Sequence, residues 1–413
     1  MNTYAIRSTL IGSLGVALAL ASGSALAISF RITSLGPLSG TSVFGTPLNE
    51  SGQVTGEFIT TSGETRAFLW DGTRRRNLGT LGGRSSTGGS INASGQVTGR
   101  ADTASGIFRA FLWDGRRMQD LGTLGGNYSL GHDINDSGQV TGDAETAGPQ
   151  PAFHAFLWDG TTMQDLGTLG GAFSGGLAIN DAGQVTGISR TKDNALHAFL
   201  WDGTTLLDLG TLGGRTSDSR DINDSGQVTG RSLTAAGNGH AFLWDGTTMQ
   251  DLGTLGGTFS EGVDINDSGQ VTGRSFIAGD AEVHAFLWDG TTMQDLGTLG
   301  GTASEGAAIN ASGQVTGFFT MADGSGGAFL WDGNTMRDLN ALIDPADPLR
   351  PFVTLLSGLA INDLGQILAA GTSSRNRGVR AYLLTPVSIP ESGTLALLGL
   401  GLLGLGVMMR RAY

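Results

Sequence analysis

The sequence contains no cysteine, only 9 prolines, and few cations for its 413 residues. Without cysteine no disulfide can form, so packing and hydrogen bonds must hold the fold together. Lys and Arg number 24 against 37 Asp and Glu, and the formal net charge is −13. Nucleic-acid-binding proteins carry a basic stripe, and the only run of three cations, at 74–76, reads as a solvated turn. The composition therefore predicts no nucleic-acid partner.

Glycine is abundant, with 70 residues. It follows no G-x-y period, which excludes collagen, and proline is too scarce for a disordered Pro/Gly linker. Glycine at this density suits turns that need positive φ. These observations predict an all-β, turn-rich protein.

The N-terminal segment has the pattern of an export signal. Arg7 precedes the apolar stretch IGSLGVALALA, and Ala25 and Ala27 provide a small-x-small cleavage site. The order of basic, apolar and small residues is typical of a secretory signal peptide. We therefore expect residues 1–27 to be removed on export.

The C-terminal segment, residues 387–413, has the pattern of a membrane anchor. Thr394–Met409 is uncharged and mostly apolar, and Arg410 and Arg411 follow it. As a helix it would span roughly 24 Å, somewhat short of a hydrocarbon core of about 30 Å. The two arginines would lie on the cytoplasmic side.

This segment resembles the PEP-CTERM sorting signals of exported Gram-negative proteins. Pro390 and Glu391 match the family's motif, whereas Ser392 stands where a second proline is usual. The resemblance implies an exosortase-like partner, anchoring in the inner membrane during sorting, and then a cell-surface or extracellular location.

A repeat fills residues 28–386. A Gly-Gln dipeptide recurs every 43 to 52 residues, beginning at Gly52, Gly95, Gly138, Gly183, Gly226, Gly269, Gly313 and Gly365. Eight copies at this period indicate stacked structural units. Each copy has four strand-like runs, such as 220–223, 226–232, 240–244 and 248–255. Asp-Gly in WDGTT predicts a hairpin between the last two.

Four antiparallel strands in about 43 residues are the plan of a propeller blade. In HAFLW of 240–244 both faces are largely apolar, as expected for a strand covered on two sides by neighbouring blades. The chain begins with an outer-type strand, 30–36, and ends with three inner-type strands. We therefore expect about eight four-stranded blades with a one-plus-three closure; the alternative is a β-solenoid.

The units HAFLWDG, DLGTLGG and INDSGQVTG resemble HAF repeats, a family of extracellular bacterial repeats, over roughly residues 30 to 385. The resemblance implies an exported repeat protein. It carries no reaction and no catalytic residues.

The repeated polar residues predict structure rather than chemistry. The first residue of HAFLWDG is His in four copies, at His154, His197, His240 and His284, and Arg or Gly in others, which indicates blade-edge residues near Phe and Trp. DINDSG, starting at Asp133, Asp221 and Asp264, resembles a Ca²⁺ loop but lacks a Glu at the twelfth position, so we expect a tight turn. We predict no catalytic, metal or cofactor site.

The copies differ most between GQVTG and AFLW, where the predicted loops share one face with the GTLGG connections. Repeat proteins usually bind through their variable face. We therefore expect a non-enzymatic, surface or matrix protein that binds polysaccharide or another protein there. The alternative is a glycan hydrolase that uses carboxylates from several blades, with Asp133, Asp221 and Asp264 near the axis.

Overall fold

The computed structural model describes residues 28–37 and 46–387. Ser29–Val387 forms one compact unit. The predicted signal peptide, with Ala25 and Ala27, and the predicted sorting segment, with Pro390, Glu391, Arg410 and Arg411, lie outside the described residues. No helix occurs among the residues described, so none there could cross a membrane.

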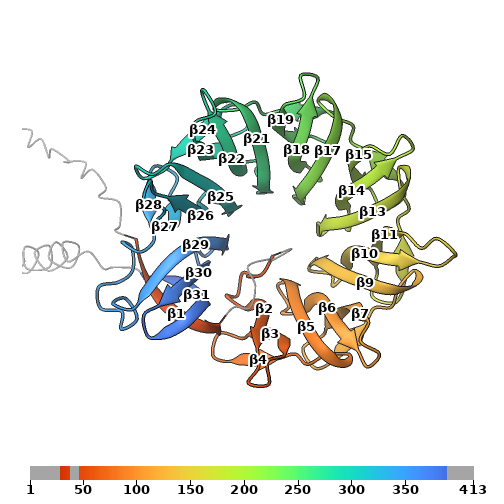
Figure 1. The fold of residues 1–413 in the computed structure, drawn as a ribbon, viewed down its shortest axis with the longest axis horizontal. Coiled ribbons are helices and arrows are strands. Elements are labelled where there is room, and N and C mark those ends of the chain that lie inside the picture. The colour runs from red at the N-terminus through yellow and green to blue at the C-terminus, as the bar shows by residue number, and fades with distance from the viewer. Residues whose placement is uncertain (1–27, 38–45, 388–413) are drawn as a thin grey trace, which may run out of the picture. The chain divides into compact units, whose positions relative to one another are not determined.

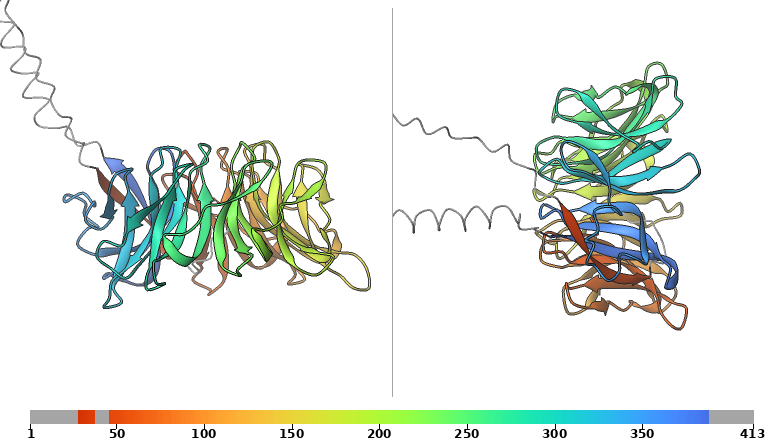
Figure 2. Two further views of the ribbon diagram at one scale, coloured as in Figure 1. Left: turned by 90° about the horizontal axis from the view of Figure 1, so that it is seen from above. Right: turned by 90° about the vertical axis from the view of Figure 1, so that its left-hand side faces the viewer.

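The described chain is all β, and its sheets stand radially around a central axis as in a β-propeller (Figure 1). Seen from the side, the turns gather at two opposite faces of these sheets (Figure 2). In chain order the strands are β1 (Ser29–Pro37), β2 (Val54–Ile59), β3 (Thr65–Trp70), β4 (Arg75–Asn77), β5 (Gly82–Ile91), β6 (Val97–Thr103), β7 (Phe108–Trp113), β8 (Met118–Asp120), β9 (Gly125–Ile134), β10 (Val140–Thr146), β11 (Phe153–Trp158), β12 (Met163–Asp165), β13 (Gly170–Ile179), β14 (Val185–Thr191), β15 (Leu196–Trp201), β16 (Leu206–Asp208), β17 (Gly213–Ile222), β18 (Val228–Thr234), β19 (Gly239–Trp244), β20 (Met249–Asp251), β21 (Gly256–Ile265), β22 (Val271–Ile277), β23 (Val283–Trp288), β24 (Met293–Gly297), β25 (Ala303–Ile309), β26 (Val315–Thr320), β27 (Gly326–Trp331), β28 (Met336–Asp338), β29 (Val353–Ile361), β30 (Ile367–Ser373) and β31 (Asn376–Val387).

All the sheets but one follow the chain from the axis outwards, and one of these, β2 to β4, has three strands. The sheets β5 to β8, β9 to β12, β13 to β16 and β17 to β20 each have four antiparallel strands in sequence order. Strands β21 to β28 form two such groups, which one parallel pair, Val283 with Ala303, links into a single sheet. Strand β1 pairs with β31, which gives the order β1-β31-β30-β29. Apart from that single pair, the paired strands named here are antiparallel, as a propeller requires and a solenoid of stacked parallel coils does not.

The strand boundaries differ from the sequence expectation at both edges of a sheet. The inner strand β17 begins at the Gly-Gly of GTLGG and has ten residues, whereas we expected it to begin at residue 220. The outer strand β20 has only three residues. It ends because Gly253 adopts a φ of 73° and donates its N–H to the carboxylate of Asp251 at 2.8 Å, which turns the chain towards the next sheet.

The core consists of apolar wedges between neighbouring sheets. In one wedge, Ala241 and Leu243 of β19 pack against Val271 of β22 and against Phe286 and Trp288 of β23. All five of these residues are at most 6% exposed. The prediction that both faces of the HAFLW strand are covered is therefore confirmed, and the tryptophans act as spacers between sheets.

Candidate functional site

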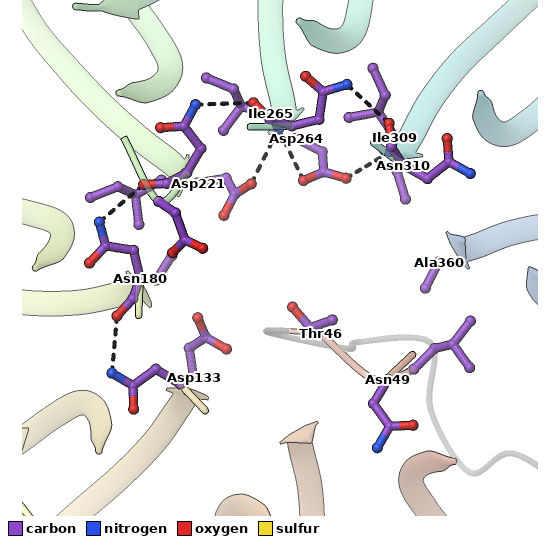
Figure 3. Close-up of a pocket in the computed structure, with 18 of the residues that line it drawn as sticks. Thr46, Asn49, Asp133, Asn180, Asp221, Asp264, Ile265, Ile309, Asn310 and Ala360 are labelled. Atoms are coloured by element: carbon purple, nitrogen blue, oxygen red, sulfur yellow. Dashed lines mark hydrogen bonds between the residues drawn. The ribbon is translucent and has the colours of Figure 1, made fainter. Parts of the chain in front are cut away.

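A ladder of asparagine side chains runs around the axis. Each Asn amide donates a hydrogen bond to the main-chain carbonyl of the corresponding Asn in the next copy, at 2.9 to 3.1 Å; several of these bonds are visible in Figure 3. The last, Asn362, donates back to the carbonyl of Asn49 at 3.0 Å. The members are Asn49, Asn92, Asn135, Asn180, Asn223, Asn266, Asn310 and Asn362, all at most 6% exposed.

The other residues of INDSGQVTG also serve the scaffold. The amide of Asn223 donates to Gln227 Oε1 at 2.8 Å, and its Oδ1 accepts from the N–H of Gln227. A Cβ on Gly226, which has a φ of 76°, would touch the Gln184 side chain of the preceding copy. Thr229 Oγ1 donates to the carbonyl of Phe242 in the adjacent strand at 2.9 Å. These bonds make the motif a tight turn that joins successive sheets.

A cavity of about 610 Å³ lies at the axis, where the inner strands end and this turn begins. All eight copies contribute residues to its lining, in the segments 46–50, 91–93, 133–136, 177–181, 220–224, 263–267, 307–311 and 359–363. Figure 3 shows Asp133, Asp221 and Asp264 around this space. The variable loops lie at the opposite face, so the cavity belongs to the constant face of the ring.

A β-bulge shapes the wall of the cavity. In β17 the pairing with β18 shifts between Ser219 and Asp221, so Arg220 is an extra residue. Arg220 and Asp221 consequently both line the cavity, where strict alternation would turn one of them away. The same shift occurs in β5, β9, β13, β21, β25 and β29. In those six strands a glycine, such as Gly262 or Gly306, precedes the extra residue, whereas β17 has Ser219 there.

Each of the three axial carboxylates accepts a main-chain N–H from the next copy along the chain, and Asp133 also accepts from the preceding copy. Asp133 accepts from Ser90 Oγ at 2.7 Å and from the N–H of Ile179 at 3.0 Å. Asp264 accepts from the N–H of Ile309 at 2.8 Å. Asp221 accepts from the N–H of Ile265 at 3.2 Å in the same way. The sequence predicted that these acids gather near the axis, and the structure brings them to one cavity.

Their surroundings favour protonation. Burial raises the pKa of Asp133 to about 6, against the hydrogen bonds from Ser90 and Ile179. Burial, followed by repulsion from Asp264 and a side-chain hydrogen bond with it, raises the pKa of Asp221 well above its usual range. Burial also raises the pKa of Asp264. We therefore expect Asp221 and Asp264 to share one proton, with Asp221 as the donor.

These shifts predict that the protein is more stable at pH 5 than at pH 8. A carboxyl whose pKa is raised on folding binds more protons when folded, so its contribution to stability falls as pH rises from about 4 through the raised pKa. For Asp133 alone, a shift of about two units corresponds to about 3 kcal/mol. Urea unfolding between pH 5 and pH 8 measures the trend. Asp221→Asn, which keeps a donor for Asp264, should flatten it; an equally steep decline in that variant would contradict the shared proton.

The four histidines have a partner that the sequence analysis did not name. Each bonds through Nδ1 to an aspartate eleven residues later, at 2.8 to 3.0 Å. In β19 and β20, Phe242 lies opposite Asp251, and His240 is the diagonal neighbour on the same face. The pairs are His154–Asp165, His197–Asp208, His240–Asp251 and His284–Asp295. The constant spacing across the WDG hairpin was the available signal.

The variable loops and the GTLGG connections do share one face, as predicted. Thr258, which follows Gly-Gly, donates to Asp280 in the loop between β22 and β23, at 2.7 Å from both its N–H and its hydroxyl. Asn127 likewise donates its N–H to Glu145 at 2.5 Å. In the described part of the chain, no three His, Asp or Glu side chains converge as metal ligands would.

No family model matches this sequence, and no curated protein is significantly similar to it. Solved structures with a similar fold include the propeller domain of the Trilobed protease from Pyrococcus furiosus, at 13% identity and a TM-score of 0.47, covering 76% of this chain and all of that one. Another is dipeptidyl peptidase 4 of Porphyromonas gingivalis, at 9% identity and a TM-score of 0.48, covering 84% and 60%. A third is the six-bladed fucose-binding lectin of Aleuria aurantia, at 12% identity and a TM-score of 0.30, covering 76% and 96%.

Proposed function

We propose that the ring has eight blades and that β1 completes the last blade. Two observations support this. The asparagine ladder has one member in each of the eight copies, and its final bond joins Asn362 to Asn49. The first described strand, β1, pairs over its length with the last, β31. A ring of this kind joins the ends of the repeat region and leaves no unpaired first or last sheet.

We propose that this ring is a non-catalytic binding protein whose variable-loop face takes up polysaccharide or another protein. The supporting observation is that the repeated polar residues hold the scaffold together, whereas the residues that differ between copies lie in exposed loops. The repeated polar side chains are occupied by bonds within and between sheets, as in the ladder of Asn223. The copies differ instead in the exposed loops between second and third strands, such as 148–151 and 279–281. Variation confined to one exposed face is typical of ligand recognition.

An exchange of loops within the chain tests this proposal. Replacing 278–282 (AGDAE) by the loop at 235–238 (AAGN) keeps a turn that the chain already uses in the same position. We expect weaker binding to the extracellular polysaccharide or surface proteins of the producing cell, with only a small fall in unfolding temperature from the loss of the exposed bonds between Thr258 and Asp280. The control, Thr247→Asn on the opposite face, copies the WDGNT turn at 331–335 and should bind normally. Equal binding by both variants would exclude the loop face.

We further propose that the protein is exported through its signal peptide, sorted by exosortase-like machinery at the inner membrane and then displayed at the cell surface or released. The residue patterns at 1–27 and 387–413 support this. The intact mass of the mature protein tests it in membrane and medium fractions. A species from Ile28 to about Pro390 means that both signals are cut, whereas one that keeps Tyr413 in the membrane means that the second is only an anchor.

A second candidate function is glycan hydrolysis at the axial cavity. The observation that favours it is the pair Asp221 and Asp264, because one protonated and one ionised carboxyl are what a general acid and its partner require. Against it, both carboxylates already accept main-chain N–H groups. Turnover of a polysaccharide that Asp221→Asn abolishes would establish this function, and a broad substrate screen without turnover would exclude it.

A further inference from the structure

Charge is distributed unevenly around the ring. Residues 125–338 contain 7 Lys and Arg against 26 Asp and Glu. The rest of the repeat region, 29–124 and 339–387, contains 14 against 10. This second part forms adjoining sheets: the one with β1 and β29 to β31, then β2 to β4, then β5 to β8 (Figure 1). One arc of an acidic protein is therefore basic.

Five cations of this part of the chain lie close together, in and directly after the turns that follow WDG. In most copies that turn reads WDGTT, but the first two described copies read WDGTRRR and WDGRR. The side chain of Arg74 is 76% exposed and that of Arg117 is 79% exposed. Arg116 is also exposed. These arginines replace threonines in the same turn, so the fold does not require them.

The two arginines that follow extend the arc in opposite directions. Arg76 lies over the ring of Trp113 at 5.8 Å and so reaches the next sheet. Arg75 lies over Phe58 at 4.1 Å on the other face. Its Nη1 donates to the carbonyl of Leu35, in β1, at 3.3 Å and so reaches the preceding sheet. The basic arc thus crosses three neighbouring sheets.

Few carboxylates neutralise these cations. Arg74 and Arg117 have only the aspartate of their own turn, at 3.5 and 3.7 Å. Among the described residues, Arg76 and Arg116 form no ion pair. In a protein with a net charge of −13, four arginines that are weakly paired or unpaired form a surface suited to an external anion.

We propose that this basic arc, made of Arg74, Arg76, Arg116 and Arg117, binds an acidic polysaccharide through its carboxylates. A guanidinium donates in a planar fork that matches a carboxylate. A single exposed ion pair contributes about 1 kcal/mol or less, so useful affinity needs several contacts along a polymer. Screening limits each charge to about 8 Å at physiological salt, so the acidic arc across the ring does not cancel the attraction.

This surface is separate from the loop face proposed above, and the inference goes beyond that function. The WDG turns lie at the same face as the axial cavity, because each connects the third strand of a sheet to the fourth, away from the variable loops. If the basic arc does not bind, the proposal for the loop face still stands. If the loop face does not bind, the proposal for the basic arc still stands.

The experiment replaces four arginines of the arc by the residues that other copies of the repeat carry at the same positions. The variant Arg74→Thr, Arg76→Gln, Arg116→Thr and Arg117→Thr carries the residues found at these positions in other copies, so its fold is supported by the remaining blades. We expect the unaltered protein to bind polygalacturonate at 50 mM salt, to bind neutral dextran weakly or not at all, and to lose affinity with added salt. The variant should bind polygalacturonate at least tenfold more weakly.

The control variant removes cations from the acidic arc. Lys192→Ala and Arg215→Thr also copy residues from other copies, and they should leave the affinity for polygalacturonate unchanged. The proposal is overturned if the unaltered protein does not bind polygalacturonate, if both variants lose affinity equally, or if duplex DNA binds as tightly. Low-salt self-association that the arginine variant abolishes, without polysaccharide binding, would assign the arc to a second copy of the chain.

Discussion

A mature chain that begins at residue 38, and so lacks β1, is expected to lose about 5 to 9 kcal/mol of stability and to aggregate. Phe30, Ile32 and Leu35 of β1 are 1%, 7% and 3% exposed. Burial of each such side chain contributes about 1.5 to 3 kcal/mol. Without β1, the strand β31 also becomes an open sheet edge, which invites pairing with another chain. Urea unfolding and sedimentation velocity measure the two effects.

Two controls separate the loss of the strand from a mere loss of chain length. Arg31→Ala alters the same strand at a side chain that is 72% exposed, and it should change stability by less than about 0.5 kcal/mol. A peptide of residues 29–37 added to the shortened chain should restore the unfolding midpoint. If the shortened chain unfolds at the original midpoint and stays monomeric, β1 does not close the ring.

The architecture could be read from the sequence because the repeat imposes it. WDG marked a hairpin in seven of the eight copies, and the apolar residues on both faces of HAFLW required cover on two sides. The residues that tie the sheets together were harder to recognise. Asn223 in INDSG looked like part of a local turn, and its bond to Asn266 spans 43 residues of chain. A bond between equivalent positions of two copies becomes visible only when the copies are placed side by side.

At the axial site, too, the sequence did not reveal contacts between copies. The sequence placed Asp221 and Asp264 near the axis, yet their shared proton depends on these acids lying in adjacent copies. In the copies that follow Asp133 and Asp264 in the chain, the same position holds Ala178 and Ala308. The bulge at Arg220 adds a second side chain to the wall, and in this copy Ser219 replaces the glycine that marks the bulge in the other copies. Strand alternation alone therefore predicts the wrong lining.

The asparagine ladder should be the most sensitive part of the scaffold to a small change. Asn223→Ala removes the partner of Gln227 Oε1, of the N–H of Gln227 and of the carbonyl of Asn266, at 2.8, 2.9 and 3.0 Å. Asn223 is 4% exposed, so water replaces these bonds poorly. Each buried group left unpaired costs about 1 to 3 kcal/mol, and we expect a loss of about 3 to 6 kcal/mol in urea unfolding.

Two further substitutions test whether the loss of stability comes from the hydrogen bonds of the Asn223 amide. Asp224→Ala, at the exposed next position, removes one bond from the N–H of Asp181 and should cost about 1 kcal/mol or less. Asn223→Asp keeps the size and the acceptor but loses both donated bonds, and it puts a carboxylate against two oxygens. It should therefore be at least as harmful as alanine. If Asn223→Asp behaved like the original protein, the bonds between copies would contribute little, and the apolar wedges alone would hold the ring together.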